Sequence, residues 1–410
     1  MKTPLIVLFC AIGLAGHAQE QLSDAPPPEP APVPVPAPRP VAAPAAVWTP
    51  PPTVFPALNS VYDRLQARKA AWKLPLSLGA WHWWHAAPDG KLSYGDTGAE
   101  GTFFYVLKAD PTSQLAGDLF KSTGIHTEIR FNDGDKFRGF FDSHLWVYEA
   151  YAWAYSDLGT IKLGKIWKRF GQDWDGSFWG GTAYYDGFKL NPDWGLSWER
   201  QIELGSAFSL STHAQFFFRE DGINGALGYA DPESIPGFTR RNTGLLRAAL
   251  TYRANSKTSF DAGLSGEIGR VASERLDVAD QQISGWAFDA GMRYTIRPNL
   301  KLRAFGEWME SVGVRSPYRY VSGGASNRLV NTNLGVQLIH GPVSYRSQVS
   351  LGRDYNPAGK QKITIHGVTV ALAKNVDLYL ERVRWTVRPG YTDSDLVFND
   401  GWELVLNWRL

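Results

Sequence analysis

The side chains that could perform nucleophilic catalysis stand close together in one segment. Ser209, Ser211 and His213 occupy every second position of "FSLSTHAQFFFR". A serine hydrolase needs its nucleophile beside a base, but residues two apart on a strand are ordinarily just the polar members of one face. The chain has no GxSxG nucleophile elbow. We therefore predict no catalytic residue and no enzymatic activity.

A pair of histidines has the spacing of a metal site on a helix. They bracket the sequence "HWWH" at residues 82–85. On a strand, side chains three positions apart point to opposite faces, so the two imidazoles would not share one ion. We predict no metal site and no cofactor, and we interpret the tryptophans as part of an aromatic belt at a membrane interface.

Charged residues at alternating positions form a larger chemical pattern. Nine of them have the parity opposite to the apolar residues of their own segments, and we predict that they line one interior: Glu128, Arg130, Arg247, Asp261, Asp289, Arg293, Arg303, Glu307 and Arg346. Rings of charged side chains decide which ions enter a pore. Two interpretations stay open, because the arginines could guide anions or could pair with the acidic residues across a wall.

The elements that must position these residues are long strands. In "GWAFDAGMRYTI", Trp286, Phe288 and Ala290 fall on one face, and Asp289 and Gly291 fall on the other. Such segments run for about 10–13 residues, which exceeds the usual 5–6 of soluble sheets and suits a tilted membrane crossing. The pattern predicts an all-β fold, an antiparallel transmembrane β-barrel.

The connections between the strands alternate in length. Short ones near 155–159, 253–257, 296–300, 340–342 and 373–375 alternate with long polar ones at 171–193, 220–242, 271–284, 312–327 and 388–400, as in a barrel with short periplasmic turns and long outer loops. We predict sixteen strands, with eighteen as the alternative, near 75–86, 101–109, 122–132, 145–156, 159–170, 194–202, 206–219, 243–254, 258–270, 285–296, 299–311, 328–340, 343–353, 362–373, 376–387 and 401–410.

The N-terminal region divides into three segments. Residues 1–18 have the charged, apolar and small-residue parts of a cleaved signal peptide. Residues 19–56 form a Pro-rich linker, which we place in the periplasm, and residues 57–73 have the spacing of a short amphipathic helix. The barrel then occupies 74–410. A formal charge of only +2 and a single cysteine argue against a nucleic-acid partner and against a disulfide scaffold.

Two segments resemble known families. The segment "GWELVLNWRL" (401–410) resembles the C-terminal assembly signal of bacterial outer-membrane proteins, although Leu410 stands where that signal commonly has Phe. The strand "AYAWAYSDLGTIKLGKIWKRFG" (150–171), an aromatic loop and then "GLSWERQIELGSAFSLS" (195–211) resemble part of Gram-negative porins, and most of all the phosphate-selective porin O and P family.

This resemblance implies an outer-membrane porin through which small hydrophilic solutes diffuse passively, with a preference for anions such as phosphate. It implies outer-membrane lipids as surroundings, a homotrimer, and a constriction loop at 171–193 that would include Asp173, Trp174, Asp175 and Trp179. The alternative is a sugar-selective porin with an aromatic track of Phe217, Phe305 and Tyr379. An outer-membrane hydrolase and a structural barrel without transport are the weaker readings.

Overall fold

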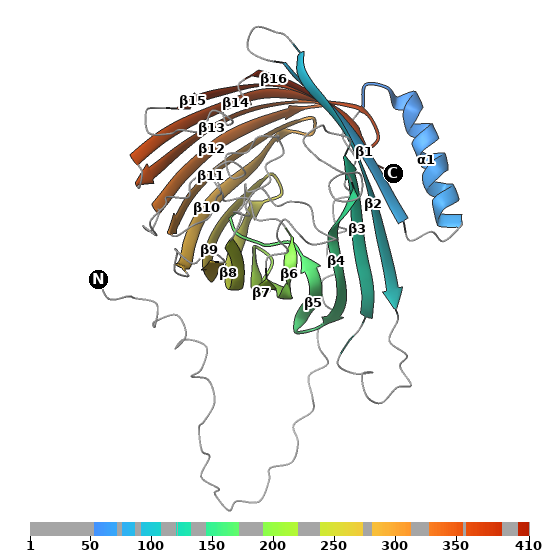
Figure 1. Cartoon of the computed structure of the whole chain (residues 1–410). Helices are drawn as coiled ribbons and strands as arrows, with labels where there is room; N and C mark the ends of the chain where they lie inside the picture. Colours follow the sequence, from blue (N-terminus) through green and yellow to red (C-terminus); the bar gives the residue numbers. More distant parts are fainter. Residues whose placement is uncertain are drawn as a thin grey trace, which may run out of the picture. The chain divides into compact units, whose positions relative to one another are not determined.

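The computed structural model describes residues 53–71, 76–86, 92–107, 120, 122–132, 145–171, 192–219, 238–273, 281–312, 328–355, 358–387 and 401–409. One helix and sixteen strands lie in these ranges (Figure 1). They are α1 (Pro56–Ala71), β1 (Leu76–Ala86), β2 (Leu92–Leu107), β3 (Ser122–Asn132), β4 (Leu145–Ser156), β5 (Gly159–Ile166), β6 (Asp193–Glu203), β7 (Phe208–Arg219), β8 (Phe238–Asn255), β9 (Thr258–Ser273), β10 (Gln281–Arg297), β11 (Leu300–Val312), β12 (Arg328–His340), β13 (Val343–Tyr355), β14 (Ala358–Ala373), β15 (Val376–Val387) and β16 (Gly401–Arg409).

The strands form one closed antiparallel barrel. Each strand pairs with its neighbours in sequence, and β1 pairs with β16 to close the wall. Closure leaves no strand edge unpaired, which a membrane-spanning sheet requires. The predicted fold class and the count of sixteen strands are confirmed, and the alternative of eighteen is wrong.

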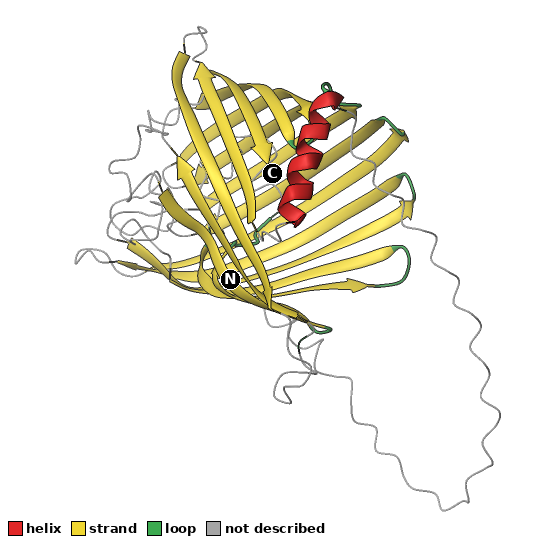
Figure 2. Cartoon of the chain, turned by 90° about the vertical axis from the view of Figure 1, so that its right-hand side faces the viewer, coloured by secondary structure: helices red, strands yellow, loops and turns green. Residues whose placement is uncertain are grey.

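Within the described ranges, two-residue turns join five pairs of consecutive strands. Those after β4, β8, β10, β12 and β14 contain only the residues 157–158, 256–257, 298–299, 341–342 and 374–375. Because the strands run antiparallel in chain order, these turns all lie at one end of the barrel (Figure 2). The predicted alternation of short and long connections is not complete, because the connection from β2 to β3 at this end spans 108–121, and the one from β13 to β14 at the other end contains only 356–357.

The two faces of the wall differ in chemistry. Apolar side chains point outward and are exposed, for example Leu264 at 51% and Phe288 at 54% of their surface, whereas the inward Ser265 and Asp289 are each 1% exposed. Ala290 is exposed on the outer face, and its neighbour Gly291 lies opposite Asp261 on the inner face. An exposed belt of large apolar residues around a polar interior suits a lipid environment.

Several strand boundaries differ from the prediction. Strands β8, β10 and β14 begin at Phe238, Gln281 and Ala358 instead of 243, 285 and 362, and β9 ends at Ser273 instead of 270. Strand β2 begins at Leu92 instead of 101, because backbone pairing with β1 carries the strand through a glycine-rich stretch of low strand propensity. Strand β5 ends at Ile166 instead of 170. The residues that follow β5 leave the wall, and they are described with the site.

Helix α1 is tied to the turn between β14 and β15. The N–H groups of Val54 and Phe55 donate to the carbonyls of Ala371 and Leu372, at 3.0 and 2.7 Å, and Lys374 forms an ion pair of 2.6 Å with Asp63. Among the described residues, no helix is both long and apolar enough to cross a membrane. The signal peptide and most of the Pro-rich linker, residues 1–52, lie outside the described residues, so both stay predictions.

Candidate functional site

The most informative feature of the interior is the segment from Trp167 to Gly171, which we call the inner segment. It follows β5, but its backbone hydrogen bonds go to inward side chains of other strands instead of to a neighbouring strand. The N–H of Trp167 donates to Glu149 Oε1 of β4 at 3.1 Å. The chain therefore turns from the wall into the barrel immediately after Ile166.

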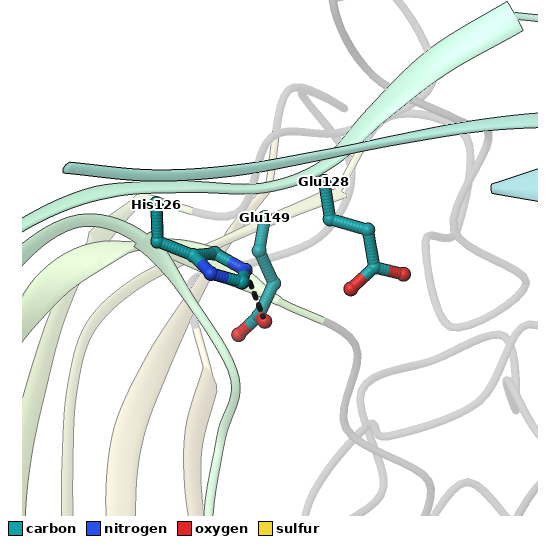
Figure 3. Close-up of side chains that lie close together, drawn as sticks. All are labelled: His126, Glu128 and Glu149. Atoms are coloured by element: carbon teal, nitrogen blue, oxygen red, sulfur yellow. Dashed lines mark ion pairs between the residues drawn. The ribbon is translucent and has the colours of Figure 1, made fainter. Parts of the chain in front are cut away.

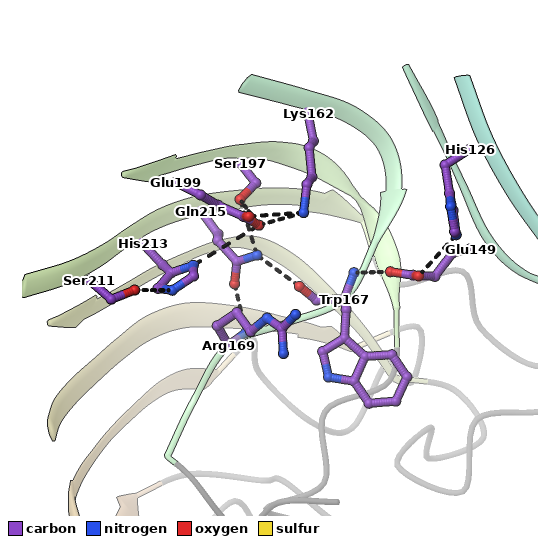
Figure 4. Close-up of polar contacts among 10 residues, drawn as sticks. All are labelled: His126, Glu149, Lys162, Trp167, Arg169, Ser197, Glu199, Ser211, His213 and Gln215. Carbon is purple, nitrogen blue, oxygen red and sulfur yellow. Dashed lines mark hydrogen bonds and ion pairs between the residues drawn. The ribbon is translucent and has the colours of Figure 1, made fainter. Parts of the chain in front are cut away.

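Gln215 of β7 anchors the middle of the inner segment. Its Oε1 accepts from the N–H of Arg169 at 2.7 Å, and its Nε2 donates to the carbonyl of Trp167 at 2.8 Å. The Gln215 amide thus satisfies one backbone donor and one backbone acceptor of the inner segment, as a neighbouring strand would. Its Nε2 also lies 3.3 Å from Ser197 Oγ of β6, which fixes the amide against the wall (Figure 4).

The far end of the inner segment reaches β9. The N–H of Gly171 donates to Ser265 Oγ at 3.0 Å, and Ser265 also accepts from Arg247 at 2.9 Å. Arg247 in turn holds Asp289 through two hydrogen bonds of 2.6 and 3.0 Å. Gly171 has a φ of +75°, and a Cβ there would strike the carboxylate of Glu307, so only glycine fits this position without strain.

A buried ion pair fixes the inner segment to β6. Lys168 Nζ pairs with Asp193 Oδ2, and the side chains of Lys168 and Asp193 are 2% and 4% exposed. The same ammonium group lies 5.5 Å from the centre of the Phe217 ring. Two opposite charges that are removed from water stabilise a fold only when they are well paired. Because this pair joins Lys168 of the inner segment to Asp193 of β6, it holds the segment in its path along that strand.

A second polar network lies nearby on β5, β6 and β7 (Figure 4). Ser211 Oγ is 3.1 Å from His213 Nε2, but His213 Nδ1 is 4.0 Å from Glu199, and Lys162 holds that carboxylate at 2.8 and 2.9 Å. A catalytic histidine needs a close, orienting carboxylate, and here a lysine occupies it. The arrangement is a wall network and does not have the geometry of a catalytic triad.

Strands β3 and β4 carry a third polar group. Arg130 Nε donates to Glu128 at 2.6 Å, and the guanidinium group lies 3.3 Å from the centre of the Tyr148 ring. His126 Nε2 lies 3.3 Å from Glu149 Oε2 (Figure 3). Glu149 therefore contacts both β3 and the first residue of the inner segment.

The remaining charged residues of the predicted set differ in exposure. Arg293 is 62% exposed and lies 3.8 Å from Asp261, whereas Arg346 is 2% exposed and its guanidinium group lies 5.0 Å from the centre of the Phe305 ring. Glu307 is 3% exposed, and Arg303 is partly buried. The nine residues are thus divided between several local pairs, and they do not form one continuous basic row.

The predicted constriction residues Asp173, Trp174, Asp175 and Trp179 lie outside the described residues. Sequence reasoning missed the inner segment and its anchors, because it extended the strand to residue 170. The three-residue spacing of Lys162, Lys165 and Lys168 is no signal for the end of the strand, because Lys162 and Lys165 both lie within β5.

Comparison with known proteins places the fold. No protein-family model matches the chain, and no curated protein matches its sequence. Among solved structures, OmpF of Salmonella typhi in complex with daunomycin is 16% identical, with a TM-score of 0.53 over 82% of this chain and 97% of OmpF. This chain has the fold of outer-membrane porins.

Two forms of OmpT, an outer membrane protein of Vibrio cholerae, are also similar. The mutant lacking loop L8 and the in-vitro folded trimer form each have a TM-score of 0.50 and 11% identity, over 82% of this chain and 98% of theirs. Identities this low establish the porin fold alone, so the activity must be argued from the interior of the barrel.

Proposed function

We propose that this protein is an outer-membrane channel through which small hydrophilic solutes diffuse passively. The observation that carries the proposal is the inner segment, which leaves the wall after Ile166 and is held by Gln215 and Ser265 on the inner face. A sixteen-stranded barrel is wide enough for an aqueous channel, and a segment fixed along its inner face narrows that channel. Polar inner walls keep water in the passage, and the apolar outer belt faces lipid.

The charges of the inner face favour weak ion selectivity. Arg247 is engaged with Asp289, and Arg130 with Glu128, so these arginines are largely neutralised for a passing ion. A preference for anions such as phosphate, as the resemblance to the phosphate-selective family implies, then depends on exposed arginines such as Arg293 and on Arg303. We retain this preference as the finer part of the proposal.

The sugar-selective alternative has less support. Phe217 is 2% exposed and lies next to Lys168, and the ring of Phe305 is next to Arg346. A sugar ring needs an open aromatic face on which to stack, and Phe217 offers none. The other two residues of the predicted track, Phe305 and Tyr379, are partly exposed.

Localisation and assembly complete the proposal. We infer an outer-membrane location from the porin fold and the apolar outer belt, with export by the predicted signal peptide. A homotrimer is proposed as well, since the similar OmpT of Vibrio cholerae is described in a trimer form. Neither statement is needed for the diffusion mechanism.

A liposome-swelling experiment tests the proposal. The full chain is reconstituted into vesicles that contain an impermeant polymer, and swelling is followed in iso-osmotic solutions of neutral solutes of increasing size. We expect rapid swelling with small polyols and sugars and a steep decrease for larger oligosaccharides. Swelling no faster than in protein-free vesicles, with the barrel shown to be folded by circular dichroism, would refute the channel.

A further inference from the structure

One group on the inner face has the donor set of a metal site. It consists of His126 and Glu128 on β3 and Glu149 on β4 (Figure 3), and one ligand atom of each residue lies within 4.8 Å of the other two. We propose that these three residues bind a divalent transition-metal ion such as zinc. This site is additional to the diffusion function and does not depend on it.

The backbone of β3 and β4 builds the group. His126 and Glu128 are two residues apart, so both side chains project from the same face of the strand. Glu149 is the partner of Glu128 across the ladder, and the register shifts immediately beyond this pair, which leaves Tyr148 as an extra residue in β4. Such a bulge re-aims neighbouring side chains, and here it accompanies two carboxylates placed opposite each other.

The distances fit a small ion. His126 Nε2 and Glu149 Oε2 are 3.3 Å apart, close to the spacing of about 3.4 Å expected between ligands at about 2.1 Å from a tetrahedral zinc. His126 Nε2 is a buried atom with no hydrogen-bond partner among the described residues, and it points at the carboxylate (Figure 3). The side chains of His126, Glu128 and Glu149 remain 14%, 13% and 17% exposed, so an ion can reach them from the interior.

Neighbouring groups orient the three ligands. Glu149 accepts from the N–H of Trp167 through Oε1, and Glu128 accepts from Arg130 through Oε1; we assign the second oxygen of each carboxylate to the metal. The His126 ring stacks on Tyr151, with centroids 4.6 Å apart and an interplanar angle of 17°. Supporting contacts of this kind typically fix metal ligands in place.

Charge and donor type select the class of ion. The two carboxylates and the nearby Glu100, 3.8 Å from Arg130, place negative charge around the imidazole, and this charge favours a cation. An imidazole with carboxylates suits zinc and its neighbours in the first transition row, whereas Mg²⁺ and Ca²⁺ prefer oxygen ligands alone. Positions left open by three protein ligands would be filled by water.

The inner face also offers a matched control. His213 lies 4.0 Å from Glu199, which is again an imidazole beside an inward carboxylate. There, however, the group next to the carboxylate is the ammonium of Lys162, at 2.8 and 2.9 Å. A lysine in the place of a second carboxylate repels a cation, so this pair should not bind zinc.

The experiment is a calorimetric titration of zinc chloride into the folded full chain in detergent micelles, with magnesium chloride as a second probe. We expect saturable binding of one zinc ion per chain and no comparable binding of magnesium. His126→Gln and Glu149→Gln should each weaken zinc binding at least tenfold, and His213→Gln should leave it unchanged. Glutamine at position 149 keeps an acceptor for the N–H of Trp167, so the inner segment stays anchored.

The proposal is wrong if the wild-type chain shows no one-site zinc binding, if both variants bind as tightly as the wild type, or if His213→Gln weakens binding equally. Folding of each variant is checked by its heat-modifiable mobility on gels. If the His126→Gln variant does not fold, the zinc affinity of Glu149→Gln alone decides whether the proposal stands. Because binding is measured without transport, its failure leaves the channel proposal standing, and failure of the channel leaves the metal site standing.

Discussion

On strand β10, Phe288 and Asp289 are neighbours in the chain, yet Phe288 is 54% exposed and Asp289 is 1% exposed. The same contrast separates Leu264 from Ser265 on β9. In a soluble sheet protein the apolar residue would be the buried one. Here the outer face offers mainly apolar contact to its surroundings, while the inner face is occupied by hydrogen bonds and ion pairs that hold both the wall and the inner segment.

The two faces tolerate substitution differently. On the outer face, stability depends mainly on apolarity, because most of the contacts there join apolar or aromatic side chains, such as the stacked rings of Phe208 and Tyr252. On the inner face, it depends on pairing, since a polar side chain that is buried among its neighbours and shielded from the passage is costly to leave without its partner. Substitutions on the inner face should therefore be most damaging where they break a buried pair, and those on the outer face where they introduce a charge.

The largest effect is expected where a buried pair on the inner face is broken. Arg247→Gln leaves Asp289, which is 2% exposed in its side chain, without its two hydrogen bonds from Arg247, and should reduce the free energy of unfolding by about 3–5 kcal/mol. The exposed counterpart Arg293→Gln should cost under about 1 kcal/mol. Urea unfolding of the inserted barrel measures both, and equal losses would show that the inner pairs are not distinguished by burial.

The next prediction compares two adjacent positions on opposite faces. Ala290→Arg places a charge on the apolar outer belt and should cost about 2–4 kcal/mol of stability in a bilayer. Gly291→Arg projects inward, where a Cβ would strike Asp261 Oδ2, so the carboxylate must shift. Because the new guanidinium group can pair with that carboxylate, we expect a smaller cost than for Ala290→Arg. The measurement is the folding yield of each variant into lipid vesicles. Equal losses of yield at the two positions would contradict the assignment of the faces.

A smaller effect on stability, but a clear one on transport, is expected at the anchor of the inner segment. Gln215→Ala removes the contacts to Trp167 and Arg169, so the segment should move from its place and single-channel conductance should increase. Gln201→Ala is the control, because Gln201 contacts only Glu203 among the side chains for which a bond is described. Unchanged conductance in the Gln215 variant would mean that the inner segment does not narrow the passage.

The smallest effect is expected for selectivity. One fixed charge contributes only about 1–4 kcal/mol to the energy of a nearby ion in a hydrated pore, and salt screens it further. Replacing Arg293 and Arg303 together with Gln should shift the reversal potential toward cations, more strongly at low salt. No shift would remove the anion preference from the proposed function and leave the unselective channel.

Much of the fold follows from the sequence, whereas the site follows only in part. The face of each strand can be predicted because a period of two is a local property, as at Phe288 and Asp289. The inner segment could not be predicted, since Gln215 and Ser265 are 46 and 94 residues away from the groups that they bind. Such pairings depend on the register of strands that are distant in the chain, and local periodicity does not specify them.

The central claim is that the polar inner face encloses a water-filled passage. Single-channel recording in planar lipid bilayers tests it most directly, with the full chain added at low concentration. We expect discrete current steps that are linear in voltage and whose conductance rises in proportion to salt concentration. A barrel that inserts in its folded, heat-modifiable form and produces no such steps would contradict the account.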